Sequence, residues 1–235
     1  MFQSPFKACP MTAFTPAAAE DYDNRIRRMA PGYDLSLELI VALARQVFPP
    51  EAHILLAGCG TGTELLALAA AGPGWRFTAV DPAAAMLDSA RAKTTAAGID
   101  HRVEFIEALL GDAPLVAHDG AVSALVLHFI PDDGAKAGFL ADLRRRLCPG
   151  APLLLTDYAD TGLPSGSYER WLLDRGVAAE VVERAADWRR RVWQPVAPTR
   201  LLDLFAGAAF ATPRPFFQAL GFQGWLTSAG DSGLP

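Results

Sequence analysis

Short, mostly apolar runs recur along the first two thirds of the chain, and stretches with helical spacing separate them. A run of this kind without alternation is typical of a strand that is buried on both faces of a parallel sheet. The runs lie at His53–Ala57, Trp75–Asp81, Arg102–Ile106, Ala121–Leu127 and Leu153–Tyr158. Their order predicts one α/β domain with a mostly parallel sheet.

The helical stretches and two later strands complete the pattern. Helices are predicted at Ala17–Met29, Leu35–Val47, Pro82–Gly98, Phe139–Leu147 and Thr199–Ala208. Pro215–Leu220 and Phe222–Leu226 predict an antiparallel pair that closes the sheet, with Gly221 as a candidate bulge. The single domain then divides into a loose arm (1–15), amino-terminal helices (16–50), a cofactor-binding core (51–160), a helical insert (161–198), a closing helix and strands (199–228) and a tail (229–235).

A glycine turn follows the first strand. Gly58, Gly60 and Gly62 let the backbone fold where any Cβ would collide with a ligand, and the first N–H groups of the next helix point to the same place. This G-x-G-x-G pattern has Thr63 where a dinucleotide site needs a third glycine, and it lacks the Gly-Lys-Ser/Thr of a phosphate loop. Asp81 ends the second strand, where its carboxylate can accept both hydroxyls of a ribose. The stretch predicts a nucleotide-type cofactor site.

Composition narrows the candidate functions. The chain has 235 residues, 51% of them apolar, which suffices for one large domain, and a net charge of −5 favours small substrates over nucleic acid. Its three cysteines, Cys9, Cys59 and Cys148, fit neither a disulfide framework nor a Cys-x-x-Cys metal site. No metal is expected. The absence of a secretion signal and of an 18-residue apolar stretch predicts a cytoplasmic protein that does not span a membrane.

Ile54–Gly62 followed by Phe77–Met86 resembles the first two motifs of class I S-adenosylmethionine-dependent methyltransferases, and the likeness covers about residues 30 to 228. It implies a Rossmann-like three-layer α/β/α sandwich with a mostly parallel seven-stranded sheet, one antiparallel strand, a helical insert and amino-terminal helices. It also implies S-adenosylmethionine as the cofactor and S-adenosylhomocysteine as the product. The implied cofactor-binding positions are Tyr33, Gly58, Cys59, Gly60, Asp81, Pro82, Met86, Ala108, Leu109, Ala124 and Leu125.

Two positions depart from the resembled family. Leu56 stands where many members carry an acidic residue, so the amino end of the cofactor must be held elsewhere. Tyr33 is one candidate for that contact, and capping of a packed helix is the alternative. Ala108–Leu109 replaces the Gly-Asp that accepts from the adenine amino group. Adenine is then expected to be held by backbone groups and apolar walls, unless Asp112 or Glu107 reaches it.

Polar side chains near the reacting methyl group are expected at His128, Asp157 and Tyr158, at the carboxyl ends of two strands. A histidine at a strand end more often hydrogen-bonds backbone than acts as a general base. His128 is therefore only a weak catalytic candidate. The catalytic residues stay unknown at this point.

The insert at 161–198 is predicted to form two amphipathic helices, one on each side of Gly176. In the resembled enzymes an aromatic insert after the fifth strand lies over the cofactor mouth, which implies a substrate wall. The alternative is a solvated face above a homodimer interface. The predicted outer faces carry Arg170, Arg175, Arg184, Arg189, Arg190 and Arg191.

The leading function is methyl transfer from S-adenosylmethionine to a small molecule. Pro31-Gly32-Tyr33 also occurs in carboxy-S-adenosylmethionine synthase-like enzymes, so modification of the cofactor, or of a tRNA wobble uridine, is an alternative. The net negative charge of the chain argues against tRNA as the substrate. Because Leu56 and Leu109 replace polar family positions, a non-catalytic S-adenosylmethionine-binding module is a further alternative.

Overall fold

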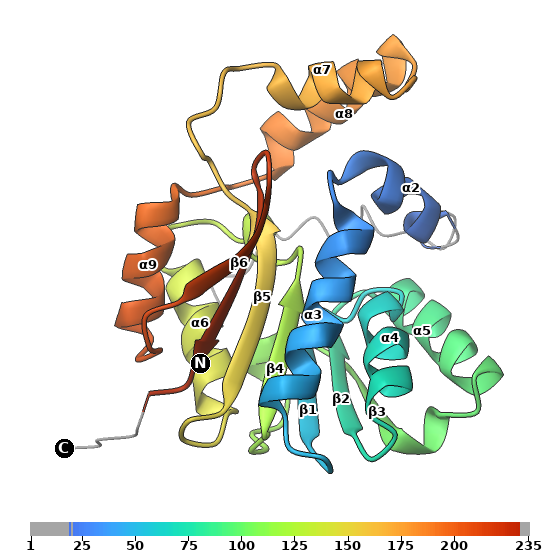
Figure 1. The fold of residues 1–235 in the computed structure, drawn as a ribbon, viewed down its shortest axis with the longest axis vertical. Helices are drawn as coiled ribbons and strands as arrows, with labels where there is room; N and C mark the ends of the chain where they lie inside the picture. The colour runs from blue at the N-terminus through green and yellow to red at the C-terminus, as the bar shows by residue number, and fades with distance from the viewer. Residues whose placement is uncertain (1–18, 20, 231–235) are drawn as a thin grey trace, which may run out of the picture.

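A seven-stranded sheet runs through the middle of the molecule in the computed structural model, which describes residue 19 and residues 21–230 (Figure 1). Six of the described strands run in the same direction and β7 runs opposite to them, in the order β3-β2-β1-β4-β5-β7-β6. The predicted fold class is confirmed. The strands are β1 (His53–Ala57), β2 (Arg76–Asp81), β3 (Val103–Glu107), β4 (Gly120–Ala124), β5 (Pro152–Tyr158), β6 (Arg214–Ala219) and β7 (Phe222–Ser228).

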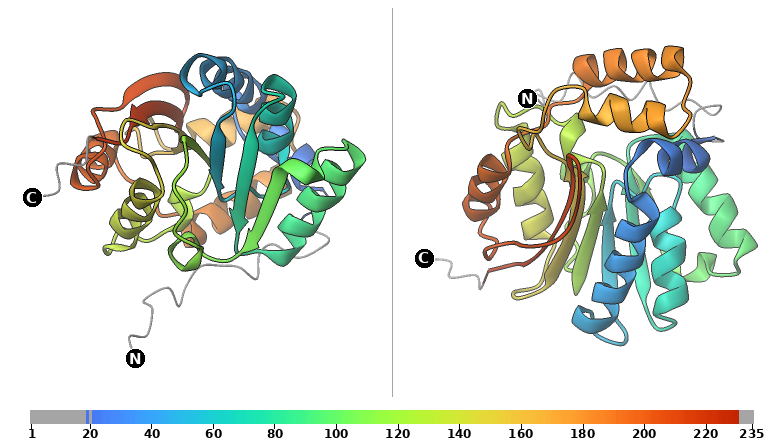
Figure 2. Two further views of the ribbon diagram at one scale, coloured as in Figure 1. Left: turned by 90° about the horizontal axis from the view of Figure 1, so that it is seen from below. Right: turned by 45° about the horizontal axis from the view of Figure 1, so that its top comes forward.

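Helices cover both faces of the sheet and form the outer two layers (Figure 2). One face carries α3 (Tyr33–Val47), α4 (Thr63–Ala71) and α5 (Ala84–Ala96), and the other carries α6 (Ala135–Arg145) and α9 (Pro198–Gly207). The pleat of β1 explains why its run is apolar without alternation. Ile54 packs toward the first face and Leu55 toward the second, so both faces of the strand are buried.

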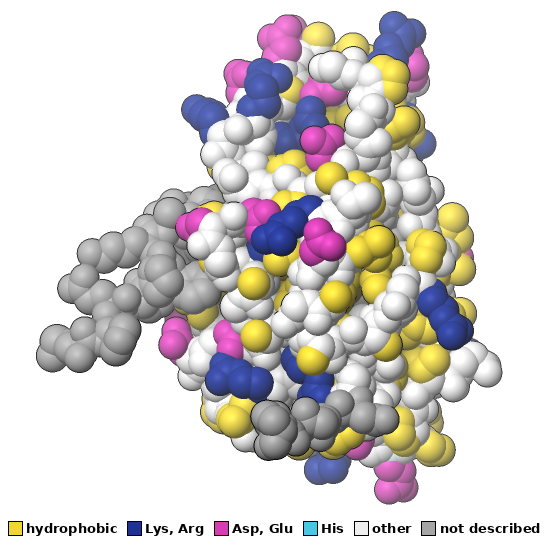
Figure 3. All heavy atoms as spheres, turned by 90° about the vertical axis from the view of Figure 1, so that its left-hand side faces the viewer, with side chains coloured by type: hydrophobic (Ala, Val, Ile, Leu, Met, Phe, Trp, Pro, Cys, Tyr) yellow, Lys and Arg dark blue, Asp and Glu magenta, His cyan; other side chains and the backbone are white. Residues whose placement is uncertain are grey.

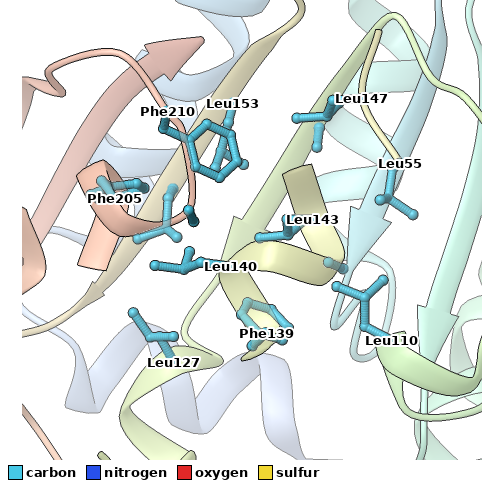
Figure 4. Packing of buried hydrophobic residues seen from close by; sticks show 14 of the residues in the cluster. Leu55, Leu110, Leu127, Phe139, Leu140, Leu143, Leu147, Leu153, Phe205 and Phe210 are labelled. Carbon is cyan, nitrogen blue, oxygen red and sulfur yellow. The ribbon is translucent and has the colours of Figure 1, made fainter. Parts of the chain in front are cut away.

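The core on the α6 side combines aliphatic and aromatic side chains of α6 and α9 with those of the strands and their connections (Figure 4). Leu140 and Leu143 of α6 are fully buried and share this cluster with Phe205 of α9 and with Leu153 of β5. Full burial of one such side chain contributes roughly 1.5–3 kcal/mol. This packing fixes α6 against the sheet, and α6 in turn forms one wall of the site described below.

The fourth strand is shorter than predicted and ends at Ala124 instead of Leu127. Beyond it Leu125 has a positive φ of 58°, and a 3₁₀ turn, η4 (Leu127–Phe129), follows. Side chains from two other elements cause this turn. The Asp157 carboxylate accepts from the backbone N–H groups of Leu127 (2.5 Å) and His128 (2.9 Å), and Lys136 Nζ donates to the Leu127 carbonyl (2.8 Å).

Two smaller predictions at the chain ends also need correction. The irregularity in the β6–β7 ladder lies between Pro215 and Phe217, where proline has no N–H to donate, and Gly221 lies in the connecting turn. The helix predicted from Ala17 is described as α2 (Tyr22–Met29), and its predicted start at 17–18 lies outside the described residues. The arm at 1–15 and most of the tail also lie outside them.

His118 lies buried at the amino end of the sheet and should make the fold sensitive to acid. Its ring contacts His53 (centroids 4.5 Å apart), and burial lowers the pKa of His118 from 6.5 to about 4. The unfolded chain protonates this histidine near pH 6.5, whereas the folded chain does so only near pH 4. The free energy of unfolding is therefore unaffected by this group above pH 6.5. It should fall by about 2–3 kcal/mol as the pH drops toward 4.

Urea unfolding at a series of pH values measures this loss. Replacement of His118 by Leu should make stability less dependent on pH between 6.5 and 4.5, whatever its effect at neutral pH. The exposed His101 provides the control, because His101→Gln should leave the pH dependence unchanged. An equal pH dependence in wild type and His118→Leu would contradict the assignment.

Candidate functional site

A cavity of about 210 Å³ lies where the parallel strands β1, β2, β3 and β4 end. Ligands bind on this side of open α/β sheets because the chain connections diverge there. All eleven residues predicted to bind the cofactor line this cavity: Tyr33, Gly58, Cys59, Gly60, Asp81, Pro82, Met86, Ala108, Leu109, Ala124 and Leu125. The structure brings them together, and their contacts with a ligand stay predictions.

The glycine turn has the geometry that its sequence predicts. Gly58, Gly60 and Gly62 all have positive φ, which side chains rarely adopt. A Cβ at Gly58 would lie 2.2 Å from a methyl group of Val126, whereas a Cβ at Gly60 would meet nothing within 4 Å. Gly58 therefore allows the turn to pack on the residues after β4, and Gly60 leaves an open backbone surface beside the cavity.

Asp81 ties the glycine turn to the start of α5. Its Oδ2 accepts from the Gly60 N–H and its Oδ1 accepts from the Ala83 N–H, each at 2.9 Å. Burial raises the pKa of Asp81, while these two hydrogen bonds favour its ionised form. A carboxylate has about four acceptor sites, so it can receive further donors from the cavity.

Glu64 and Tyr33 form a hydrogen-bonded pair at the other side of the glycine turn. Tyr33 Oη donates to Glu64 Oε1 at 2.9 Å, and both residues line the cavity. Burial raises the pKa of Glu64, and burial together with the neighbouring Glu64 charge raises the pKa of Tyr33. A half-buried carboxylate with a neutral donor beside it suits a cationic group of a ligand.

Asp23 joins helix α2 to the glycine turn through side-chain hydrogen bonds. The Asp23 carboxylate accepts from Thr61 Oγ1 (2.5 Å) and Thr63 Oγ1 (3.2 Å), and it pairs with Lys93 Nζ at 2.5 Å. Burial opposes ionisation of Asp23, but these hydrogen bonds and the Lys93 charge outweigh it and hold the pKa of Asp23 below its usual value. Tyr22 of α2 thereby becomes part of the cavity wall.

The opposite end of the cavity is mostly apolar. Ala108 and Leu109 line it after β3, as do Phe129 and Ile130 after β4. Glu107 and Asp112, the two acids considered from the sequence as adenine acceptors, are exposed and do not line the cavity. Neither Glu107 nor Asp112 therefore replaces the hydrogen-bond acceptor for adenine that positions 108–109 lack.

His128 lies behind the cavity wall and not in it. The residue is 3% exposed, and its Nδ1 lies 2.8 Å from Asp157 Oδ1. Its ring packs on Phe129 and on Trp193, with centroids 4.1 and 4.4 Å apart. The His128 ring is thus hydrogen-bonded to the Asp157 carboxylate, and not to the backbone as expected. A structural role for His128 remains a prediction.

The insert forms two helices, α7 (Ser167–Asp174) and α8 (Ala179–Val192), which project beyond the sheet in Figure 1. We call residues 161–198 the lid, and that they cover a substrate stays a prediction. Tyr168 Oη donates to the Met29 carbonyl at 2.6 Å, so the lid is joined to the end of α2. Trp193 packs on Tyr158 at 4.8 Å between ring centroids. Charged side chains of both signs gather on the outer surface of the lid (Figure 3).

Arg189 is an exception to the predicted outer face of arginines. Its guanidinium donates to Tyr158 Oη at 2.9 Å, pairs with Glu169 and lies over the rings of Tyr158 and Tyr168. Glu169 Oε2 and Arg189 Nε are buried without a hydrogen-bond partner among the described residues. The inward position follows from aromatic packing between the lid and β5, which helical spacing alone does not reveal.

Sequence reasoning overlooked Glu64 and Asp23 as site residues. Glu64 lies in the first turn of α4, directly after the glycine turn, and that position was a usable signal for a residue facing the ligand. Asp23 gave no such signal, because its partners are 38, 40 and 70 residues away in the chain.

No helix in the described part of the chain is long and apolar enough to cross a membrane. Within the same residues, no group of three or more His, Cys, Asp or Glu side chains is placed to hold a metal ion.

Comparisons with known proteins point to a methyltransferase domain. Residues 54–150 match a family described as a methyltransferase domain. A carboxy-S-adenosyl-L-methionine synthase from Campylobacter lari is 25% identical over 89% of the chain and 91% of its own length. A synthase of the same name from Klebsiella pneumoniae is 28% identical over 67% of the chain, and the match spans 64% of that protein.

Solved structures show the same fold at lower identity. The S-adenosylmethionine-dependent methyltransferase SibL superimposes with a TM-score of 0.63 at 19% identity, covering 84% of this chain and 55% of SibL. The chain thus spans about half the length of that protein. At this identity the likeness concerns the fold alone.

Proposed function

We propose that this chain, which belongs to the class I S-adenosylmethionine-dependent methyltransferase family, transfers the methyl group of S-adenosylmethionine to a small molecule at the cavity beside β1 and β2. One observation carries the proposal. The cavity joins an open glycine turn to two carboxylates, the buried Asp81 on one side and the half-buried Glu64 on the other.

The residues present fit the cofactor. Asp81 would accept the ribose hydroxyls, because both of its oxygens keep acceptor capacity beyond their backbone bonds. Glu64 would bind the ammonium group of the amino-acid end, with Tyr33 as a second polar partner. Glu64 thus takes the place of the acidic residue that Leu56 replaces in the first strand.

S-adenosylmethionine, when bound, supplies a methyl group on a sulfonium that is already a good leaving group. The protein then needs to position the acceptor in line and exclude water, and placement alone can supply roughly 7–11 kcal/mol. Among the polar side chains expected near the methyl group, His128 and Asp157 are bound to each other and do not line the cavity. The chemistry is therefore proposed to need no general base from His128.

The lid favours a small acceptor. Phe129 lines the cavity and packs on Trp188 of α8 at 5.9 Å between ring centroids, so lid and cavity share a wall. An aromatic wall of this kind suits a compact, partly apolar molecule better than a polyanion. The lid would then cover the acceptor, and the homodimer considered from the sequence stays a prediction.

A second candidate is modification of the cofactor itself. The relatives from Campylobacter lari and Klebsiella pneumoniae are named carboxy-S-adenosyl-L-methionine synthases, and the first matches over nearly the whole chain. The Arg189–Glu169 pair joins α8 to α7 within the lid and keeps polar atoms without a partner among the described residues, and these would provide polar groups for a charged reactant. This candidate uses the same cavity and differs in the atom that reacts.

Calorimetry and mass spectrometry test both candidates. S-adenosylmethionine and S-adenosylhomocysteine should each bind with roughly micromolar affinity, about −7 to −9 kcal/mol. Turnover with small acceptors should add the mass of one CH₂ to the acceptor. Cofactor modification, with a carboxyl donor supplied as co-substrate, would add the mass of CO₂ to the cofactor. A protein that binds neither cofactor form would refute the proposal, and binding without any product would favour a non-catalytic module.

The lid should become more ordered when ligands bind. Residues 161–198 join the rest of the chain through a small cluster that includes Tyr168, Leu172 and Phe222, separate from the two clusters on the sheet faces. The Gln194 N–H also donates to the His128 carbonyl at 2.6 Å. We expect amide hydrogen exchange in α7 and α8 to be faster than in β1 and β4, and to slow with S-adenosylhomocysteine and acceptor present. Exchange as slow as in the strands, with no response to ligand, would contradict a lid.

A further inference from the structure

The cavity end formed by residues 108–111 contains a carboxylate that belongs to a different element. Asp142 of α6 lines the cavity together with Gly111 of the 3₁₀ turn η3 (Leu110–Asp112). Its side chain is 14% exposed. The sequence around residues 108–112 gives no indication of it, because Asp142 lies 30 residues further along the chain.

The two oxygens of Asp142 have different surroundings. Oδ1 pairs with Arg145 and lies 3.9 Å from Arg146 Nη1, whereas Oδ2 has no hydrogen-bond partner within the described residues. Oδ2 points to Gly111, since a Cβ at that position would lie 2.8 Å from it. Gly111 therefore leaves room for a free acceptor beside the cavity.

Arg146 fixes this arrangement. It is 2% exposed, and its guanidinium donates to the Ala113 carbonyl (2.5 Å), the Pro114 carbonyl (3.3 Å) and the Asp142 carbonyl (3.0 Å). One buried side chain thus joins the chain after η3 to the end of α6. Asp142 is held at a constant position relative to the cavity wall of residues 108–111.

The other acids of the cavity already have roles or lie in unsuitable places. Glu64 accepts from Tyr33, and Asp81 accepts from the backbone beside the glycine turn. Asp133 is exposed, and its Oδ1 accepts from the Ala135 N–H at the start of α6. Asp142 alone among these four offers a mostly buried oxygen without a partner at the end opposite to Glu64.

We propose that Asp142 Oδ2 accepts a hydrogen bond from the exocyclic amino group of the adenine base and so determines the base specificity of the site. The inference rests on the proposed function, because it assumes an adenosyl cofactor in the cavity. A carboxylate accepts from an amino group and repels the carbonyl oxygen that hypoxanthine carries at the same position. Arg146 acts as the positioning residue of this contact.

The test compares S-adenosylhomocysteine with S-inosylhomocysteine by calorimetry. Wild type should prefer the adenosyl compound by about tenfold or more, which corresponds to about 1.4 kcal/mol. Asp142→Ala should lose most of this preference, chiefly through weaker binding of the adenosyl compound. Gly111→Ala provides a second variant, because its Cβ displaces Oδ2 without changing the charge, and it should also reduce the preference.

Asp133→Ala tests the rival acid. A preference that survives in Asp142→Ala, or that disappears in Asp133→Ala instead, would overturn the inference while leaving the methyltransferase proposal intact. Failure of wild type to bind either compound would overturn both. Melting curves of each variant show that the proteins compared are folded.

Discussion

Replacement of Asp81 by Ala should weaken binding of S-adenosylhomocysteine by at least about tenfold. Two hydrogen bonds from ribose hydroxyls to a carboxylate contribute roughly 1.5–3 kcal/mol each. The loss should exceed that of a simple contact residue, because Asp81 also holds the Gly60 and Ala83 N–H groups that shape the turn. Calorimetry measures the affinity, and a lower melting temperature of the free variant is expected as well.

Asp88→Ala is the matched control, since Asp88 is an exposed acid of α5 whose pair is with Arg91. It should leave affinity unchanged. A second ligand distinguishes direct binding of the ribose by Asp81 from the support that Asp81 gives to the glycine turn. Wild type should bind S-adenosylhomocysteine more tightly than its 2′-deoxy analogue, and Asp81→Ala should bind the two more nearly alike. Equal affinity of wild type for both ligands would argue against the ribose assignment.

Replacement of Glu64 by Gln should weaken cofactor binding by about tenfold or more and should not destabilise the free protein. Burial raises the pKa of Glu64, so the ionised side chain is unfavourable in the free fold at neutral pH, and a neutral amide removes that cost. The same change removes a charge-assisted contact to the ammonium group of the cofactor. The melting temperature of Glu64→Gln should equal or exceed that of wild type.

Methylthioadenosine, which lacks the amino-acid end, is the control ligand. Its affinity should be nearly the same in wild type and Glu64→Gln, whereas that of S-adenosylhomocysteine should fall. Tyr33→Phe should show a smaller loss of the same kind, because its hydroxyl donates to Glu64 and carries no charge. If Glu64→Gln lowers the melting temperature and weakens both ligands equally, Glu64 is structural.

The fold could be predicted from the sequence because local patterns determine most of it. The strand-helix order, the glycine turn and the terminal antiparallel pair all follow from periodicity and glycine placement, and the structure has them. The end of β4 could not be predicted. Leu125–Phe129 turns away from the sheet because Asp157 and Lys136 bind its backbone, and neither is a neighbour in sequence.

The candidate site divides in the same way. Residues next to the strand ends, such as Asp81 and Leu109, could be placed from the pattern, and they line the cavity. Residues that reach it from elsewhere could not. Asp142 lines the cavity from the far end of α6, and Asp23 of α2 binds the glycine turn beside it. Both positions depend on how these helices pack. Arg189 points inward for a related reason, since its aromatic partners come from β5 and α7.

Helix α2 is hydrogen-bonded to the glycine turn on one side and to the lid on the other. At one end Asp23 holds the threonines of the glycine turn, and at the other the Met29 carbonyl accepts from Tyr168 of the lid. A ligand that stabilises this position of α2 reduces the conformational entropy that is lost when the second ligand binds. By thermodynamic reciprocity, cofactor and acceptor should then increase each other's affinity by the same factor.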